Sequence, residues 1–130
     1  MWTSERSRRP AVQEAEAEVG LVTLGGDPAG VNLGGERRWL PVCSPGGYAW
    51  QPAAGDKVLV LKTGAEREAP CILGRVQDGT GLGPGQVRLS GSDSSLTLGG
   101  GCIRLTGAVW INEVELEDYI RGIVMDVLGG

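Results

Sequence analysis

The stretch VRLSGSDSSLTLGGGCIRLTGAVWIN, residues 87–112, decides the fold of this chain because apolar and polar residues alternate through it. Alternation with a period of two is typical of β-strands, whose successive side chains point to opposite faces. Glycines interrupt the pattern every few residues, so each predicted strand is short and ends at a tight turn. Apolar residues at i and i+2 share one face of each strand, in four pairs: Val87 and Leu89, Leu96 and Leu98, Ile103 and Leu105, and Val109 and Ile111.

Strands this short cannot enclose a core within one chain, because each offers only two aliphatic side chains. In one interpretation, three copies of the chain wrap around a common axis as an intertwined β-prism or β-helix over residues 79–112, and the eight paired residues line that axis. In the other interpretation, the strands form a meander that packs against the side of the preceding domain. The pattern leaves both interpretations open.

The composition also favours an oligomer. Gly occupies 23 of the 130 positions, and the chain has no Phe. Glycine raises the conformational entropy lost on folding and buries no side chain, so a single copy gains little from collapse. Partner subunits are a usual source of the missing apolar contacts.

Residues 16–78 predict a small antiparallel barrel. The segment KVLVLK, residues 57–62, is apolar on both faces and is therefore expected to be a central strand. Short turns join it to its neighbours without any helical period, which favours a five-stranded OB-type barrel, with an SH3-like barrel as the competitor. Residues 1–15 are polar and charged, and we expect a flexible arm there. The other strand patterns lie at residues 16–24, 31–43 and 70–76.

Residues 113–130 change period and predict an amphipathic helix followed by a short tail. Asn112 is the expected N-cap, and acidic residues follow it in the first turn, where the helix dipole favours negative charge. Such a helix must dock on its own chain or bundle with other copies. Its apolar face comprises Leu116, Tyr119, Ile120, Ile123, Val124 and Val127. The fold class expected for the whole chain is thus mainly all-β: an OB-like barrel, a Gly-rich trimeric prism and a short C-terminal helix.

No pattern in the chain indicates an enzyme. Without histidine there is no imidazole base for a catalytic triad, and three widely spaced cysteines do not make a zinc site. Asp56 and Asp78 flank strands, and a turn role is expected for them rather than a catalytic one. We expect no cofactor and no metal, and we expect Cys43, Cys71 and Cys102 to be buried or half-buried thiols in a reducing compartment.

The charge argues against nucleic acid as the partner of the whole chain, since the net charge is −4. Trp39, Tyr48 and Trp50 nevertheless suggest a rival hypothesis, in which they form a stacking platform beside Arg37 and Arg38. The chain would then be a monomeric OB-fold module that binds single-stranded nucleic acid or a peptide. Core or loop packing is the simpler expectation for these three aromatic residues.

Three short motifs carry a resemblance to a known family. They are GDKVLV at residues 55–60, PCILG at residues 70–74 and VWINE at residues 109–113. Together with the glycine-punctuated strands, they resemble the baseplate spike proteins of contractile-tailed phages, of the baseplate assembly protein V type, and especially the short prophage versions. Glu113 departs from the family pattern, in which Gly is usual at that position.

The resemblance implies a homotrimeric structural protein at the tip of the tail tube, which helps assemble the baseplate and puncture the host envelope. Its partners would be other baseplate and tail-tube proteins, with transient envelope contact and no nucleic acid. The location would be the virion tail baseplate, after synthesis in the bacterial cytoplasm. No apolar segment follows the N-terminal arginines, so we expect no signal peptide. Spikes of this kind often hold iron at an HxH apex, which a chain without histidine cannot form.

Overall fold

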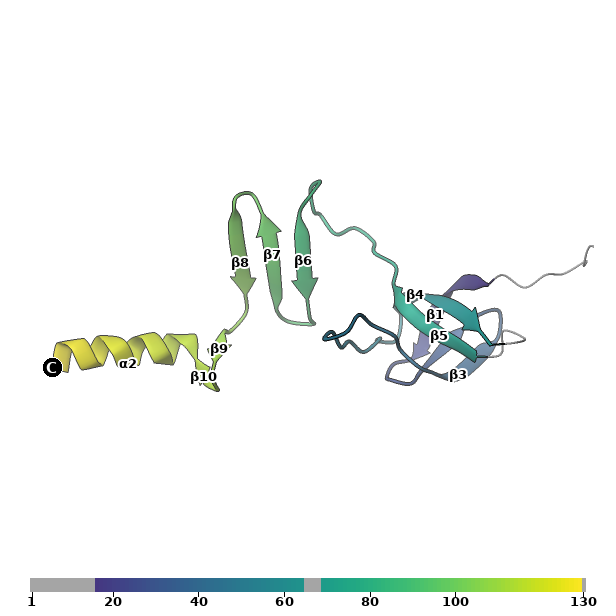
Figure 1. The fold of residues 1–130 in the computed structure, drawn as a ribbon, viewed down its shortest axis with the longest axis horizontal. Coiled ribbons are helices and arrows are strands. Elements are labelled where there is room, and N and C mark those ends of the chain that lie inside the picture. Colours follow the sequence, from purple (N-terminus) through teal and green to yellow (C-terminus); the bar gives the residue numbers. More distant parts are fainter. Residues whose placement is uncertain (1–15, 65–68, 130) are drawn as a thin grey trace, which may run out of the picture. The chain divides into compact units, whose positions relative to one another are not determined.

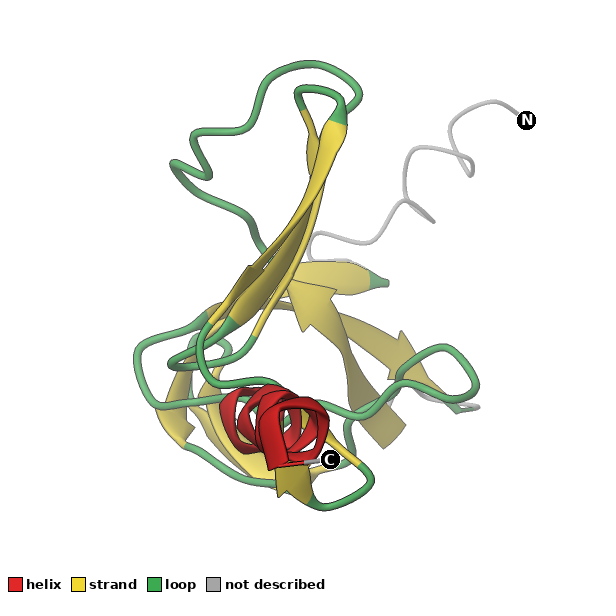
Figure 2. Cartoon of the chain, turned by 90° about the vertical axis from the view of Figure 1, so that its left-hand side faces the viewer, coloured by secondary structure: helices red, strands yellow, loops and turns green. Residues whose placement is uncertain are grey.

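The computed structural model describes residues 16–64 and 69–129, so the arm expected at residues 1–15 lies outside the described residues (Figure 1). The described part is mainly β, as expected, with antiparallel sheets followed by a helix (Figure 2). The chain divides into two compact units, one up to Asp78 and one from Gly79.

The first unit holds a five-stranded antiparallel sheet in the order β3-β2-β1-β4-β5. Among the described residues the strands form this open order, and their pairing does not make a closed barrel. β4, predicted to be central, does lie inside the sheet, between β1 and β5. The strands of this sheet are β1 (Ala17–Leu24), β2 (Ala29–Asn32), β3 (Glu36–Leu40), β4 (Lys57–Thr63) and β5 (Ala69–Arg75).

The core of this unit consists of small aliphatic side chains from one face of the sheet. On β4, Val58 and Val60 are buried while Leu59 between them is 37% exposed, so this strand alternates instead of being buried on both faces. Leu33, Val42 and Trp50 pack against the core from the loops. The fully buried members are Val22, Ala29, Val31, Leu40, Val58, Val60 and Ile72.

The chain just beyond β3 runs alongside β5. Val42 forms a parallel bridge with Ile72, the backbone N–H of Cys43 donates to the Ile72 carbonyl at 2.8 Å, and the Ile72 N–H donates to the Pro41 carbonyl at 2.9 Å. We call this contact the β3–β5 seam. It joins the two edges of the open sheet through a few main-chain hydrogen bonds.

A bulge in β3 places Trp39 in an unusual conformation. The register with β2 shifts between Ala29–Leu40 and Val31–Arg37, and Trp39 has φ of 65°. A bulky residue rarely adopts positive φ. The Trp39 side chain is 70% exposed, so the bulge points it into solvent.

The second unit begins with a three-stranded antiparallel sheet, β6 (Val87–Ser90), β7 (Ser95–Gly99) and β8 (Cys102–Thr106). This is a meander, and one copy of the chain does not form a prism. A two-stranded hairpin follows, made of β9 (Trp110–Ile111) and β10 (Val114–Glu115), and it leads directly into α2 (Leu116–Gly129).

Asn112 was expected to cap the helix, but it does not. Asn112 and Glu113 form the two-residue loop of the β9–β10 hairpin, with φ of 48° and 65°. Positive φ at both loop residues is typical of a type I′ turn, which suits the twist of two short strands. The hairpin therefore uses the residues that sequence periodicity assigned to the start of the helix.

Candidate assembly surface

The register of the three-stranded sheet aligns the predicted apolar pairs side by side. Val87 lies opposite Leu98 and Leu89 opposite Leu96. On the other side of β7, Leu98 lies opposite Ile103 and Leu96 opposite Leu105. Residues directly opposite one another in an antiparallel pair project from the same face. We call this the apolar sheet face, and its members are Val87, Leu89, Leu96, Leu98, Ile103 and Leu105.

The apolar sheet face is open within one copy of the chain. Its exposed members range from 43% exposure at Leu98 to 71% at Ile103, and Leu96 is half-buried. Across residues 79–129, all of them described, no residue is buried. A sheet of this size has no core of its own, and burial of an aliphatic side chain contributes about 1.5–3 kcal/mol. The second unit therefore needs a covering surface to be stable.

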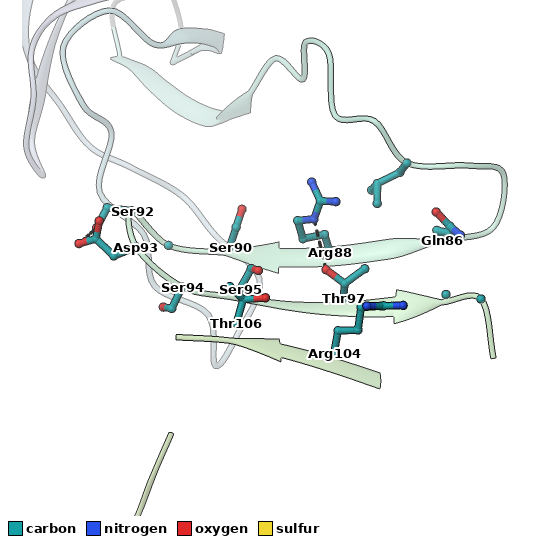
Figure 3. A pocket seen from close by; sticks show the side chains of 14 residues that line it. Gln86, Arg88, Ser90, Ser92, Asp93, Ser94, Ser95, Thr97, Arg104 and Thr106 are labelled. Atoms are coloured by element: carbon teal, nitrogen blue, oxygen red, sulfur yellow. Dashed lines mark hydrogen bonds between the residues drawn. The ribbon is translucent and has the colours of Figure 1, made fainter. Parts of the chain in front are cut away.

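The opposite face of the same sheet is polar. Arg88, Thr97 and Arg104 lie in one row across the three strands, as Figure 3 shows, and they line an open trough of about 610 Å³. Arg88 Nε donates to Thr97 Oγ1 at 3.2 Å and Arg88 Nη1 to the Thr80 carbonyl at 3.0 Å. Because one face is apolar and the other is hydrated, the sheet can pack against another surface through its apolar face only.

Ile111, the last of the predicted axis residues, lies outside this sheet, whereas Val109 lines one open depression together with Leu89, Leu96 and Leu105 of the apolar sheet face. Ile111 belongs to β9 and is 45% exposed, whereas Val109 precedes β9 and is half-buried. The Val109 carbonyl accepts a hydrogen bond from the Leu116 N–H at 2.6 Å, which ties the hairpin to the first residue of α2. Six of the eight predicted axis residues thus share one face of the sheet, Val109 lies beside that face, and Ile111 belongs to the hairpin.

The predicted helix face is also exposed. Tyr119, Ile120, Ile123 and Val124 are 47–52% exposed, Val127 is 74% exposed and Leu116 is half-buried. Apolar residues at 116, 120, 123 and 127 follow the alternating spacing of four and three that places a and d residues on a coiled-coil seam. An isolated helix of 14 residues is only marginally stable in water, so α2 also needs a covering partner.

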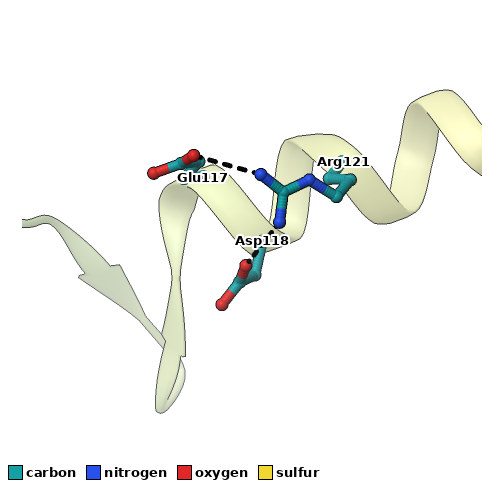
Figure 4. Close-up of polar contacts among 3 residues, drawn as sticks. All are labelled: Glu117, Asp118 and Arg121. Carbon is teal, nitrogen blue, oxygen red and sulfur yellow. Dashed lines mark hydrogen bonds and ion pairs between the residues drawn. The ribbon is translucent and has the colours of Figure 1, made fainter.

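The other side of α2 is charged in its first two turns, and it carries the exposed Met125 and Leu128 further along. Arg121 lies between two acidic residues of the first turn, with Nη2 3.1 Å from Glu117 Oε1 and Nη1 3.3 Å from Asp118 Oδ1 (Figure 4). Exposed pairs at these spacings contribute only about 0.3–0.5 kcal/mol each. They therefore contribute little to the stability of the helix.

The three aromatic residues of the predicted stacking platform differ in burial. Trp39 and Tyr48 are 70% and 61% exposed, whereas Trp50 packs against the core, with Nε1 3.4 Å from the Cys43 carbonyl to which it donates. Packing was the simpler expectation for all three, and it holds for Trp50. Trp39 instead lies beside Arg37 and Arg38 at an open depression of about 320 Å³.

Asp56 has the turn role expected of it, since its Oδ2 accepts the Ala53 N–H at 3.0 Å. Asp56 and Asp78 line one open depression of about 550 Å³, together with Lys57 and Arg75, so the formal charges there balance. Arg75 Nη1 is 3.9 Å from Asp56 Oδ1.

The cysteines are more exposed than expected. Cys71 is half-buried, but Cys43 and Cys102 are exposed, so the prediction of buried or half-buried thiols is wrong for these two. Cys43 lies at the β3–β5 seam and Cys102 at the start of β8, two places where the chain is still near a turn.

Residues 16–64 and 69–129 contain no group of three or more His, Cys, Asp or Glu side chains arranged to hold a metal ion. None of the helices in that part of the chain is long and apolar enough to cross a membrane. Comparison with protein-family models, with curated proteins and with solved structures found no match for the chain.

Sequence patterns did not indicate two features of the site. The row of Arg88, Thr97 and Arg104 depends on cross-strand register, which the alternation of each strand does not reveal. The hairpin at Asn112 and Glu113 was hidden because its second loop residue is not glycine. Glu113 departs from the family motif, in which Gly is usual, and this departure was the one sequence signal for the hairpin.

Proposed function

We propose that this chain is a homotrimeric structural protein of a contractile phage or prophage tail, a spike or hub in the baseplate, and not an enzyme. The observation that carries the proposal is that no residue of 79–129 is buried while apolar residues align on one face of the sheet and on one face of α2. Both faces require a partner, and identical copies are the partner that every molecule of the protein always has.

Three copies fit these faces better than two. Three copies of an amphipathic sheet can serve as the walls of a prism, with their apolar faces inward and the rows of Arg88, Thr97 and Arg104 outward. On α2, Ile120 occupies an a position and Ile123 a d position, and isoleucine at both positions favours trimers or tetramers over dimers. These two positions of the helix are thus compatible with the three copies that a prism requires.

We also propose that the first unit is an OB-type barrel. The order β3-β2-β1-β4-β5 leaves β3 and β5 as edges, and the β3–β5 seam joins them. This supports the partly open five-stranded barrel of that fold. A barrel of this kind would be the platform that contacts other baseplate and tail-tube proteins.

The tail assignment rests on the motif resemblance. The GDKVLV segment covers the turn before β4 and most of β4, PCILG lies within β5, and VWINE covers Val109, β9 and its turn. These segments carry the resemblance to the baseplate spike family, in which Gly is usual at the position of Glu113. Assembly of the baseplate and puncture of the host envelope would follow from a stiff axial trimer, which would act at the virion tail after synthesis in the bacterial cytoplasm.

The decisive test is the solution mass of the full chain by light scattering across a dilution series. A trimer that resists dilution is expected, because the sheet and helix faces are covered together. A monomer with a folded second unit would contradict the proposal, and it would mean that the apolar sheet face docks on the chain's own barrel.

One observation favours the rival binding module: Trp39 is 70% exposed beside Arg37 and Arg38. That function predicts salt-sensitive binding of a labelled single-stranded oligonucleotide, which Trp39→Ala abolishes. Tyr48→Ala is the matched control, since Tyr48 is also exposed but does not line that depression. Absence of oligonucleotide binding at low salt would rule this function out.

A further inference from the structure

The structure brings two cysteines from different parts of the first unit to one place. Cys43 directly follows Val42 and Cys71 directly precedes Ile72, so the two cysteines lie diagonally across the parallel Val42–Ile72 bridge of the β3–β5 seam. Val42 and Ile72 pack in the core, and residues next to such a pair project from the opposite face. Both thiols therefore lie on the outer side of the seam.

Burial raises the pKa of Cys71 above its usual value, and the neighbouring Cys43 side chain raises it further. Cys43 is the more exposed of the two. Because the thiolate is the reacting form, Cys43 is the thiol that reacts first with a reagent from solution.

We propose that Cys43 and Cys71 are a dithiol site that a small-molecule disulfide, of the oxidised-glutathione class, converts to an intrachain disulfide across the β3–β5 seam. This inference concerns the first unit alone, and it holds whether the chain is a trimer or a monomer.

The chemistry balances in two exchange steps. The Cys43 thiolate attacks the reagent disulfide, forms a mixed disulfide and releases one reagent thiol. The Cys71 thiolate then attacks the Cys43 sulfur and releases the second reagent thiol. Two protein thiols are oxidised to one disulfide, and one reagent disulfide is reduced to two thiols.

The disulfide would add a covalent link across the β3–β5 seam. Without it, the described part of the seam is held by two main-chain hydrogen bonds and one bridge. The bond closes a loop that contains the whole of β4, and a loop of this kind restricts the unfolded chain. We expect oxidation to raise the melting temperature by on the order of 10 °C.

The experiment compares full-length protein incubated with oxidised and with reduced glutathione. Intact mass, thiol titration and peptide mapping are read together with the melting temperature. We expect the oxidised sample to lose two hydrogens, to keep one free thiol at Cys102, and to yield a Cys43–Cys71 linked peptide. Alkylation of the reduced protein should modify Cys43 before Cys71.

Three single variants sharpen the result. Cys102→Ser should still lose two hydrogens, whereas Cys43→Ser and Cys71→Ser should not form an intrachain disulfide. Should either of the latter two fail to fold, the linked peptide from the unmodified sequence remains the measurement. Stable glutathione adducts at Cys43, a linkage that involves Cys102, or three free thiols after oxidation would each overturn the proposal.

Discussion

Leu96 of β7 lies directly opposite Leu105 of β8, and neither side chain is buried within the chain. The pair stands in the middle of the apolar sheet face, next to Leu89 on the other side of β7. In a folded single chain such a row is a stability defect, because it leaves apolar surface in water. In the proposed trimer the same row would be buried.

Leu105→Asp is expected to destroy the trimer. Three carboxylates would meet in an apolar column, and leaving even one charged group there unpaired costs about 2 kcal/mol or more. Light scattering should therefore report single chains. The matched control is Thr106→Asp, which introduces the same residue one position later on the polar face and should leave the mass unchanged. A fully trimeric Leu105→Asp protein would show that this face does not line the axis.

Glu113→Gly is expected to stabilise the protein. Glu113 has φ of 65° in the type I′ turn, where a side chain costs about 1 kcal/mol relative to glycine. Chemical denaturation should show a gain of about 1 kcal/mol in the free energy of unfolding. Glu113→Ala removes the same charge but keeps Cβ, so it should bring no comparable gain. Equal gains in both variants would assign the effect to charge instead of backbone conformation.

Gly122→Ala is expected to strengthen α2. No atom lies within 4 Å of the place a Cβ would occupy, and alanine inside a helix is favoured over glycine by about 1 kcal/mol. Circular dichroism should show more helix and thermal denaturation a higher midpoint. Gly100→Ala is the contrasting variant, since φ of 64° at the β7–β8 turn makes the same substitution destabilising. A loss of trimer in Gly122→Ala would mean that helices pack closely at this glycine.

Gly20→Ala tests the packing of β1 against β2. An added Cβ would lie 2.5 Å from Val31 Cγ1 and 2.9 Å from the Asn32 carbonyl oxygen, which the core cannot accommodate without shifting. Overpacking of this kind costs about 1–3 kcal/mol, measured by thermal denaturation. Gly74→Ala on β5 meets no atom within 4 Å and should be close to neutral. If the two variants lost equal stability, the clash would not be the cause.

Much of the local structure could be predicted from the sequence. The strands around Val58 and Val60, three of the four short apolar pairs and the helix beginning near Leu116 all follow from periods of two and 3.6 residues. The six residues of the apolar sheet face were identified for the same reason. Periodicity assigns a side chain to a face, and here the hydrogen-bonded register kept those faces aligned.

Other features depended on how separate segments pair. The exposed positive-φ conformation of Trp39 arises from a bulge in the β2–β3 register, and the composition of β3 contains no sign of it. The position of Asn112 in a hairpin turn, and not at a helix cap, depends on the pairing of β9 with β10. A turn residue and a cap residue have the same chemistry, so local preference could not separate them.

By itself the sequence determined most of the strands, the approximate extent of the helix, and that residues 79–129 carry too little large side chain to make a core. Those properties depend on residues that are close together in the sequence, so their spacing and size can be read from the sequence alone. Only the tertiary structure decided that Cys43 and Cys71 come to the same seam and that Leu96 stands between Leu89 and Leu105. Such contacts join residues far apart in the chain, and the register of main-chain hydrogen bonds sets them.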